Sequence, residues 1–203
     1  MAELREWPEG LIPNNISVNL VHNAKAFSSP LNSSVSTHVF PGAMWKFSLS
    51  FDTLDNFSRD EIEHLQSFIW SLNGIDGRFL MWNFSKRGTP EKGTPVVSAN
   101  GQYGGVLQTN GWQPNQLVIP RGSYFSVNNE LKFITEDMWS DATGNCSLMF
   151  TPWLRKSPAI GDKITTNKPK SIFRLADNDQ GMFDLTPGLE ATTTIEIVEA
   201  FYV

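Results

Sequence analysis

The sequence is poor in the residues on which most metal and redox sites depend. Of its 203 residues, one is cysteine and three are histidine. Cys146 cannot form an internal disulfide and lies in a strand-like run, so we interpret it as a small buried hydrophobe. His22, His38 and His64 form no His-x-x-x-His pair and no cluster with cysteine that could bind zinc. We therefore expect no metal ion and no other cofactor.

The motifs of common catalytic sites are also missing from the sequence. It contains no Gly-x-Ser-x-Gly elbow for a nucleophilic serine. The glycines between Gly101 and Gly105 are not followed by a helix, so they do not form a phosphate-binding loop. The neighbouring carboxylates Glu136 and Asp137 lie at a predicted turn, where acidic residues are common. We expect that the protein is not an enzyme and has no catalytic residues.

Positive charge and long apolar segments are scarce as well. The chain carries 16 Lys and Arg against 21 Asp and Glu, a net charge of -5, without a basic tract. This distribution disfavours nucleic-acid recognition. The apolar runs are too short to insert into a membrane, and the acidic start from Met1 to Pro8 is not a secretory signal. The chain is compatible with folding in a reducing cytoplasm.

Apolar and aromatic residues are plentiful. Hydrophobic residues make up 40% of the chain and charged residues 18%, which is typical of a globular protein. Seven tryptophans are many for this length. Tryptophan gives a large buried area at low entropic cost, so the number suggests that some lie in protein–protein contacts. The alternative is that all seven belong to the core.

The first stretch of the chain, to about Phe84, predicts strands around one helix. In Met44–Phe51 large apolar residues alternate with Lys46, Ser48 and Ser50, which is typical of an antiparallel strand with one buried face. A second apolar strand is predicted near the end of the chain, in 192–203, and must join a sheet.

The predicted helix runs from about Arg59 to Asn73. Ser58 and Glu61 fit a capping box at its start, and Asn73-Gly74 supplies a left-handed end. Its apolar stripe consists of Ile62, Leu65, Ile69 and Leu72. Because the stripe is too apolar to face water, we expect the helix to be docked on the sheet.

The middle of the chain predicts a small β-barrel inserted into the first domain. Residues 85–95 have a linker composition, and short strand-like runs follow, separated by turns. The runs are 116–119, 124–127, 131–135, 146–150 and 171–175. The predicted fold is mainly β with one helix: one domain from residues 1–84 and 180–203, and an inserted barrel from residues 85–179.

Several segments of the chain resemble the distal tail proteins of siphophages and related prophages. The segments are Val118–Val127, Glu130–Thr135, Ala142–Arg155, Ile172–Leu175 and Ile195–Phe201. In that family the strand–turn unit usually reads Gly-Asp-x-Phe, whereas Ser123 replaces the acid here. The resemblance covers most of the chain and is weaker in the first forty residues.

The resemblance implies a structural virion protein. One domain would be a tail-tube-like β-sandwich or split barrel flanked by the helix, and the insert would be an OB-like barrel. Six subunits would form a hexameric ring that connects the phage tail tube to the baseplate hub or tip. The implied partners are the tail tube protein, the tape measure protein and the hub or tip proteins, with DNA passing through the lumen without sequence recognition. The implied location is the tail tip of the virion, after assembly in the host cytoplasm.

The implied ring predicts a contact between an edge strand of one subunit and its neighbour. Ser33–Phe40 is predicted to be an edge strand of the tube-like domain, with Ser33, Val35, Thr37 and Val39 at the contact. An unpaired edge offers free N–H and C=O groups to a neighbouring subunit.

Two alternatives to the ring protein remain open. The insert could be a carbohydrate-binding module of the tail tip that contacts host glycans through Tyr103, Trp112 and Tyr124. These three side chains are more simply explained as packing the barrel or a neighbouring subunit. A glycoside hydrolase of the cell wall would need paired carboxylates in a cleft, for which the sequence gives no sign.

Overall fold

A computed structural model describes residues 3–55, 59–186 and 190–201. The expected mainly β fold with one helix is confirmed. The helical elements are α1 (Arg59–Trp70) and the 3-10 turn η2 (Gly74–Asp76). The strands are β1 (Leu4–Glu6), β2 (Asn15–Val21), β3 (Ala24–Ser28), β4 (Val35–Val39), β5 (Met44–Asp55), β6 (Arg78–Trp82), β7 (Gly93–Val97), β8 (Gly104–Trp112), β9 (Leu117–Ile119), β10 (Tyr124–Val127), β11 (Glu130–Ile134), β12 (Met138–Trp139), β13 (Cys146–Leu154), β14 (Lys170–Leu175), β15 (Asp184–Thr186) and β16 (Glu190–Glu199).

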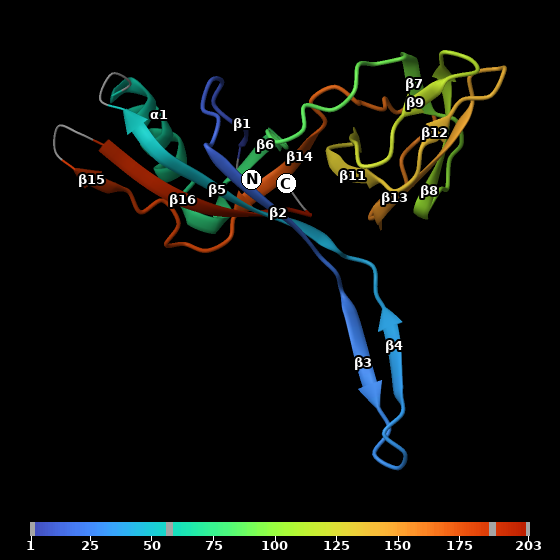
Figure 1. Ribbon diagram of the computed structural model, residues 1–203, viewed down its shortest axis with the longest axis horizontal. Helices are drawn as coiled ribbons and strands as arrows, with labels where there is room; N and C mark the ends of the chain where they lie inside the picture. Colours follow the sequence, from blue (N-terminus) through green and yellow to red (C-terminus); the bar gives the residue numbers. More distant parts are fainter. Residues whose placement is uncertain (1–2, 56–58, 187–189, 202–203) are drawn as a thin grey trace.

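The chain forms two domains and a projecting hairpin (Figure 1). The sheet domain holds a seven-stranded sheet of order β1-β6-β14-β16-β5-β2, with β15 paired to β16, and the helix α1. The insert domain, residues 87–169, holds a five-stranded sheet of order β10-β11-β13-β8-β7 and the pair β9–β12. The hairpin of β3 and β4, residues 22–41, is called the arm here.

The core of the sheet domain follows the alternation read from the sequence. In β5 the residues Trp45, Phe47, Leu49 and Phe51 are buried, and the polar residues between them lie on the other face. In β16 Ile195 and Ile197 are likewise buried, and the strand pairs with β5 along its length. The return of the last strand to the first sheet is therefore confirmed. The predicted strand extends to residue 203, whereas β16 ends at Glu199. Phe201 therefore lies beyond the strand, and Val203 lies outside the described residues.

Helix α1 covers one face of this sheet, as expected. Leu65, Ile69 and Leu72 are buried against the strands, and Ile62 is partly buried beside them. The helix ends at Trp70, and Asn73 adopts the predicted left-handed backbone conformation with φ of 55°. Ser58 of the predicted capping box lies outside the described residues.

The insert domain has a hydrophobic core of its own. Residues from β7 to β13, with Ile164 from the chain that returns, form a cluster separate from the core under the helix. Thr165 bridges to Ser126 of β10, and Lys163 bridges to Val96 of β7. Because β7 and β10 are the two edge strands of the five-stranded sheet, this segment closes the sheet toward a barrel.

The predicted boundary of the insert at residue 179 is wrong. Strand β14 was assigned to the barrel, but it pairs with β6 and β16 inside the seven-stranded sheet. The insert ends before Lys170. Its two ends lie side by side, since Thr89 N donates to Thr166 O at 3.0 Å and Lys168 N donates to Arg87 O at 2.6 Å. Adjacent ends are what the insertion of a domain into a loop requires.

Candidate interaction surfaces

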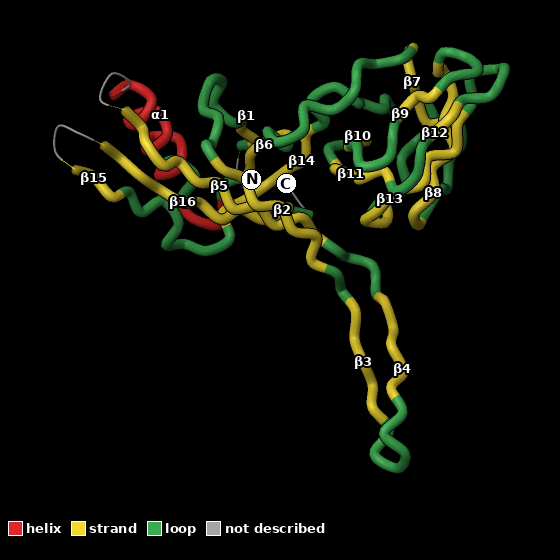
Figure 2. Tube along the Cα trace, in the orientation of Figure 1, coloured by secondary structure: helices red, strands yellow, loops and turns green. Residues whose placement is uncertain are grey.

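The arm is a long hairpin that leaves both domains (Figures 1 and 2). Strands β2 and β5 pair as far as Val21 and Met44, and the pairing resumes at Ala24 and Val39. The two long strands of the sheet thus continue beyond it as β3 and β4. Every residue from His22 to Val39 is exposed except Ser29, which is half-buried.

The exposed surface of the arm carries four large apolar side chains among polar ones: Phe27, Leu31, Val35 and Val39. Val35 and Val39 share one face with Ala24 and Ala26 of the opposite strand, and Phe27 lies on the other face. Leu31 at the tip is 95% exposed. A two-stranded hairpin is marginally stable alone in water, and clustered exposed apolar side chains mark an interaction site. The arm is therefore a surface that needs a partner.

The predicted edge strand at Ser33–Phe40 is corrected by this arrangement. The segment forms the half of the arm that returns to the sheet, and not an edge of the seven-stranded sheet, whose outer strands are β1 and β2. Val35, Thr37 and Val39 do share one face, whereas Ser33 lies in the turn with φ of 56°. The sequence analysis missed β3 as the partner strand because Ala24–Ser28 lacks alternating large apolar residues.

A groove of about 780 Å³ lies at the opposite edge of the sheet domain. Its lining residues come from β1, the following loop, α1, β6 and the returning end of the insert. They are Glu6, Trp7, Pro8, Glu9, Gly10, Ile12, His64, Leu80, Trp82, Phe84, Lys168 and Lys170.

The groove combines apolar walls with charged rims. The rings of Trp82 and Phe84 lie 4.8 Å apart, and the ammonium of Lys168 lies 5.4 Å from the Trp82 ring. Lys170 Nζ forms an ion pair with Glu6 at 2.6 Å. The loop is held in place by Trp7, whose Nε1 donates to Leu11 O at 2.7 Å. The loop leaves Ile12 63% exposed beside the groove.

A buried polar network joins the two domains. The side chain of Glu199, at the end of β16, is buried and forms an ion pair with Arg155 of the insert. Glu199 also accepts hydrogen bonds from Ser171 Oγ at 2.8 Å and from Trp45 N at 3.3 Å. The three partners of this carboxylate therefore come from three different segments: the end of β13, β14 and β5.

A second buried charge lies in the same seam. Lys132 Nζ pairs with Glu130 at 2.7 Å and donates to Trp153 O at 3.0 Å. Burial lowers the pKa of Lys132, and the nearby Glu130 carboxylate opposes this shift. Trp45 Nε1 donates across the seam to Leu131 O at 2.9 Å. The contacts of Lys132 lie within the insert, whereas the polar contacts that cross to the sheet domain include those of Trp45 with Leu131 and of Arg155 with Glu199.

Sequence reasoning missed this network, although one signal for it was present. Glu199 continues the buried period-two series of Ile195 and Ile197, so a carboxylate occupies a position that the pattern assigns to the core. Buried carboxylates require partners, and that position predicts an ion pair. The partner itself is 44 residues away in the sequence and could not be identified from it.

The three predicted stacking residues are not brought together. Trp112 is buried in the insert core, where its Nε1 donates to Thr109 Oγ1 at 2.8 Å. Tyr124 is buried in the seam, with its ring 5.6 Å from that of Trp45 and 5.2 Å from that of Phe133. Both therefore pack the protein, and a role for them in glycan stacking is wrong. Tyr103 is 72% exposed.

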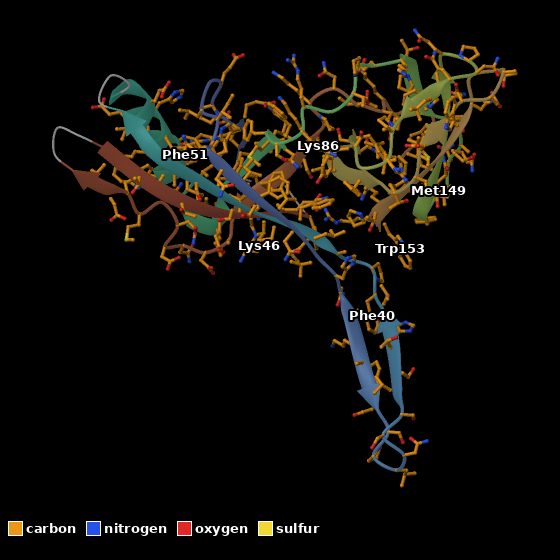
Figure 3. All side chains as sticks on the ribbon, in the orientation of Figure 1. Phe40, Lys46, Phe51, Lys86, Met149 and Trp153 are labelled. Carbon is orange, nitrogen blue, oxygen red and sulfur yellow. The ribbon has the colours of Figure 1, made fainter. Side chains whose placement is uncertain are left out.

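The insert domain exposes other large side chains that the sequence analysis did not single out. Met149 of β13 pairs with Val106 of β8, and both side chains are exposed; Trp153, farther along β13 (Figure 3), lies close to Gly105 and is half exposed. Trp153 also lines a small cavity of about 50 Å³ together with His22 and Phe40 at the root of the arm. Trp153 therefore lies at the root of the arm.

The acidic pair that we considered for catalysis has a structural role in part. Asp137 Oδ1 accepts a hydrogen bond from Arg121 N at 2.8 Å and so stabilises a turn. Within residues 3–55, 59–186 and 190–201 no group of three or more His, Cys, Asp or Glu side chains is placed to hold a metal ion.

Comparisons with protein-family models and with curated proteins find no match for this chain. Among the described residues, no helix has the length and apolar character needed to cross a membrane.

Proposed function

We propose that the protein is a structural virion component: a distal tail protein whose hexameric ring connects a phage tail tube to the baseplate hub or tip. The observation that carries the proposal is the arm, a solvent-exposed hairpin that displays Phe27, Leu31, Val35 and Val39 on an otherwise well-packed body. A surface of this kind is expected in an assembly component, because it is buried only when subunits meet.

The topology of the sheet domain supports a ring. The arm grows from β2 and β5 at one edge of the sheet, and β1 forms the other edge. If one edge of a subunit contacts the other edge of its neighbour, the association is head to tail, and such contacts close into a ring when the rotation per subunit allows it. Each subunit would offer one arm and contact one neighbour's arm.

The two faces of the sheet support an assignment of inside and outside. Helix α1 covers one face. On the other face β6 and β14 carry Arg78, Leu80, Trp82, Lys170, Ile172 and Arg174, whereas β2, β5 and β16 carry mainly hydroxyl and amide side chains. They are Asn15, Ser17, Asn19, Ser48, Ser50 and Thr194. Lys46 and Glu196 on this face form an ion pair at 2.6 Å and so offset each other's charge. The part of this face formed by β2, β5 and β16 would suit a lumen wall that passes DNA without holding it.

The seam supports a role for the insert as a fixed extension of the ring. An insert held by a buried ion pair keeps its orientation, since a rotation would separate the two charges and leave them without partners. In the proposed assembly the insert therefore holds a constant position toward the hub or tip proteins. Tail tube and tape measure proteins are the proposed partners on the side of the tube, in a particle assembled in the host cytoplasm.

The test of this proposal is cryo-microscopy of tail tips that contain the chain. We expect six copies in a closed ring between tube and hub. The matched control deletes residues 24–39, a deletion that joins two adjacent points because Phe40 N already donates to Asn23 O at 2.7 Å. This variant should fold with a similar melting temperature and fail to form rings. A monomer or a three-fold fibre at the tail tip would refute the proposal.

A second candidate function is carbohydrate binding by the insert. The exposed rings of Tyr103, Trp139 and Trp153 favour it, because exposed aromatic rings are stacking platforms for sugars. Glycan-array binding by the full chain, lost in Tyr103→Ala or Trp153→Ala, would support this function. Binding that is the same in the alanine variants would exclude these rings as the platform.

A further inference from the structure

We infer that Trp153 of the insert is a positioning residue for the arm: together with Arg155 it braces the joint at which the arm leaves the sheet, and so fixes the direction of the arm. The inference rests on the proposed ring, in which the arm makes the contact between subunits, and deepens it by naming what sets the angle of that contact. The brace belongs to a single chain and can be measured without a ring.

The joint between the sheet and the arm is an interruption in strand pairing. Strands β2 and β5 pair as far as Val21 and Met44, and β3 and β4 resume the pairing at Ala24 and Val39. Two residues on one side of the joint therefore lie opposite four on the other. Gly42 in the longer segment has φ of 105°, a conformation that suits glycine. A few residues at the ends of such elements are where a hinge can bend.

The insert reaches this joint at the end of β13 (Figure 3). Residues 151–153 form one wall of the cavity of about 50 Å³, and His22 with residues 39–43 forms the other. Arg155 Nη2 donates to Ala43 O at 3.2 Å. The joint therefore lies beside the insert, and a hydrogen bond attaches it there.

The two bracing side chains are themselves held in place. The indole of Trp153 lies over Gly105, at which a Cβ would come within 3.1 Å of the ring. Arg155 forms its ion pair with the buried Glu199, and its Cζ lies 3.8 Å from the centroid of the Phe201 ring. Because contacts within the body fix both side chains, a movement of the joint would have to break its contacts with them.

The direction of the arm is set at this joint. Every residue from His22 to Val39 is exposed except Ser29, so the described part of the body does not cover the arm along its length. Since Leu31 lies at the far end of the arm, a change of angle at the joint displaces that residue more than the root (Figure 1). A contact made through the tip therefore depends on how firmly the joint is held.

Distance measurement between two spin labels tests the brace. One label is attached to the arm through Ser36→Cys and the other to the sheet domain through Leu185→Cys, both at exposed positions. Cys146 is buried, and burial raises the pKa of its thiol to about 11, which keeps it out of the labelling reaction. The test variant is Trp153→Ala, and the matched control is Trp139→Ala, which removes another exposed tryptophan of the insert.

We expect a narrow distribution of distances for the parent chain and a distribution about twice as wide for Trp153→Ala, because the joint can then bend. Trp153→Phe should restore most of the narrow distribution, since an aromatic ring again lies beside the joint. Trp139→Ala should match the parent chain. A distribution for Trp153→Ala as narrow as that for Trp139→Ala would overturn the inference.

A second variant approaches the same contact from the side of the arm. His22→Ala removes an exposed side chain of the cavity wall and leaves the insert unchanged. It should also widen the distribution, without lowering the melting temperature. If it does not, and Trp153→Ala widens the distribution only where it also lowers the melting temperature, the brace is refuted. Because the measurement uses the free chain, that result leaves the ring standing, whereas tail tips without a six-copy ring refute the proposed function whatever the distances show.

Discussion

Replacing Glu199 by alanine tests whether the two domains behave as one unit. The substitution removes the acceptor for Arg155, Ser171 Oγ and Trp45 N, and the side chain that it truncates is fully buried. Arg155 is then left in the seam with its side chain only 16% exposed and its anionic partner gone. The loss therefore consists of an unpaired buried charge as well as missing hydrogen bonds.

The expected cost is large because of this unpaired charge. Breaking a buried ion pair from one side lowers the free energy of unfolding by about 3–5 kcal/mol. The matched control is Glu196→Ala on the same strand, whose ion pair with Lys46 is 41% exposed on each side. An exposed pair contributes about 0–1 kcal/mol. The two glutamates lie three residues apart, so backbone effects of the strand are common to both.

Urea denaturation followed by tryptophan fluorescence gives both values, since Trp45 lies in the seam itself. We expect one transition for the parent chain and either a strongly lowered midpoint or two separate transitions for Glu199→Ala. The double variant Glu199→Leu/Arg155→Met should recover much of the loss, because it removes both charges together. If Glu199→Ala and Glu196→Ala have the same midpoint, the seam does not hold the domains and the argument for a fixed insert is wrong.

Three further predictions concern the remaining elements. Leu65→Ala should lower the free energy of unfolding by about 2–5 kcal/mol, since the residue is fully buried, while the exposed His64→Ala should leave the denaturation midpoint nearly unchanged. Hydrogen bonds from Asn145 and Thr143 lower the pKa of Asp141 from 3.8, so the contribution of this carboxylate to stability is present above pH 3.8 and is lost as the pH falls toward the lowered pKa. Asp141→Asn should therefore make the free energy of unfolding less dependent on pH in that acidic range. An unchanged slope would contradict the role given to Asp141. A fragment of residues 87–169 should melt cooperatively by calorimetry because it contains the whole insert core, whereas extension to residue 179 adds β14 without its partners and should reduce solubility.

Local patterns in the sequence predicted the elements whose partners are implied by those patterns. The alternation around Phe47 identified β5 and its buried face, and the stripe around Leu65 identified the helix and the side by which it docks. In both cases one element alone shows which side chains need to be buried. The arrangement of the sheet domain followed from these two segments and the apolar strand at the end of the chain.

Local patterns in the sequence did not show which strands pair with one another. Ser171–Leu175 has the alternation of a strand whichever sheet it joins, and its closeness in sequence to the insert led to the wrong domain. The strand Ala24–Ser28 was missed because it is exposed on both faces and lacks a buried series. Strand β3 forms because the longer strands β2 and β5 continue beyond the sheet, and its own residues do not indicate it.

The positions of the buried charges and of the exposed apolar side chains connect the fold to the proposed assembly. Buried charges occur at the seam, where Glu199 and Lys132 are shielded from water, and exposed apolar side chains, among them Leu31, occur at the arm. The first arrangement fixes the angle between two domains, and the second is stabilised only when another molecule covers it. A stiff subunit with one outstretched contact is what a closed ring of identical copies requires, because small errors in angle would accumulate around the circle and prevent closure.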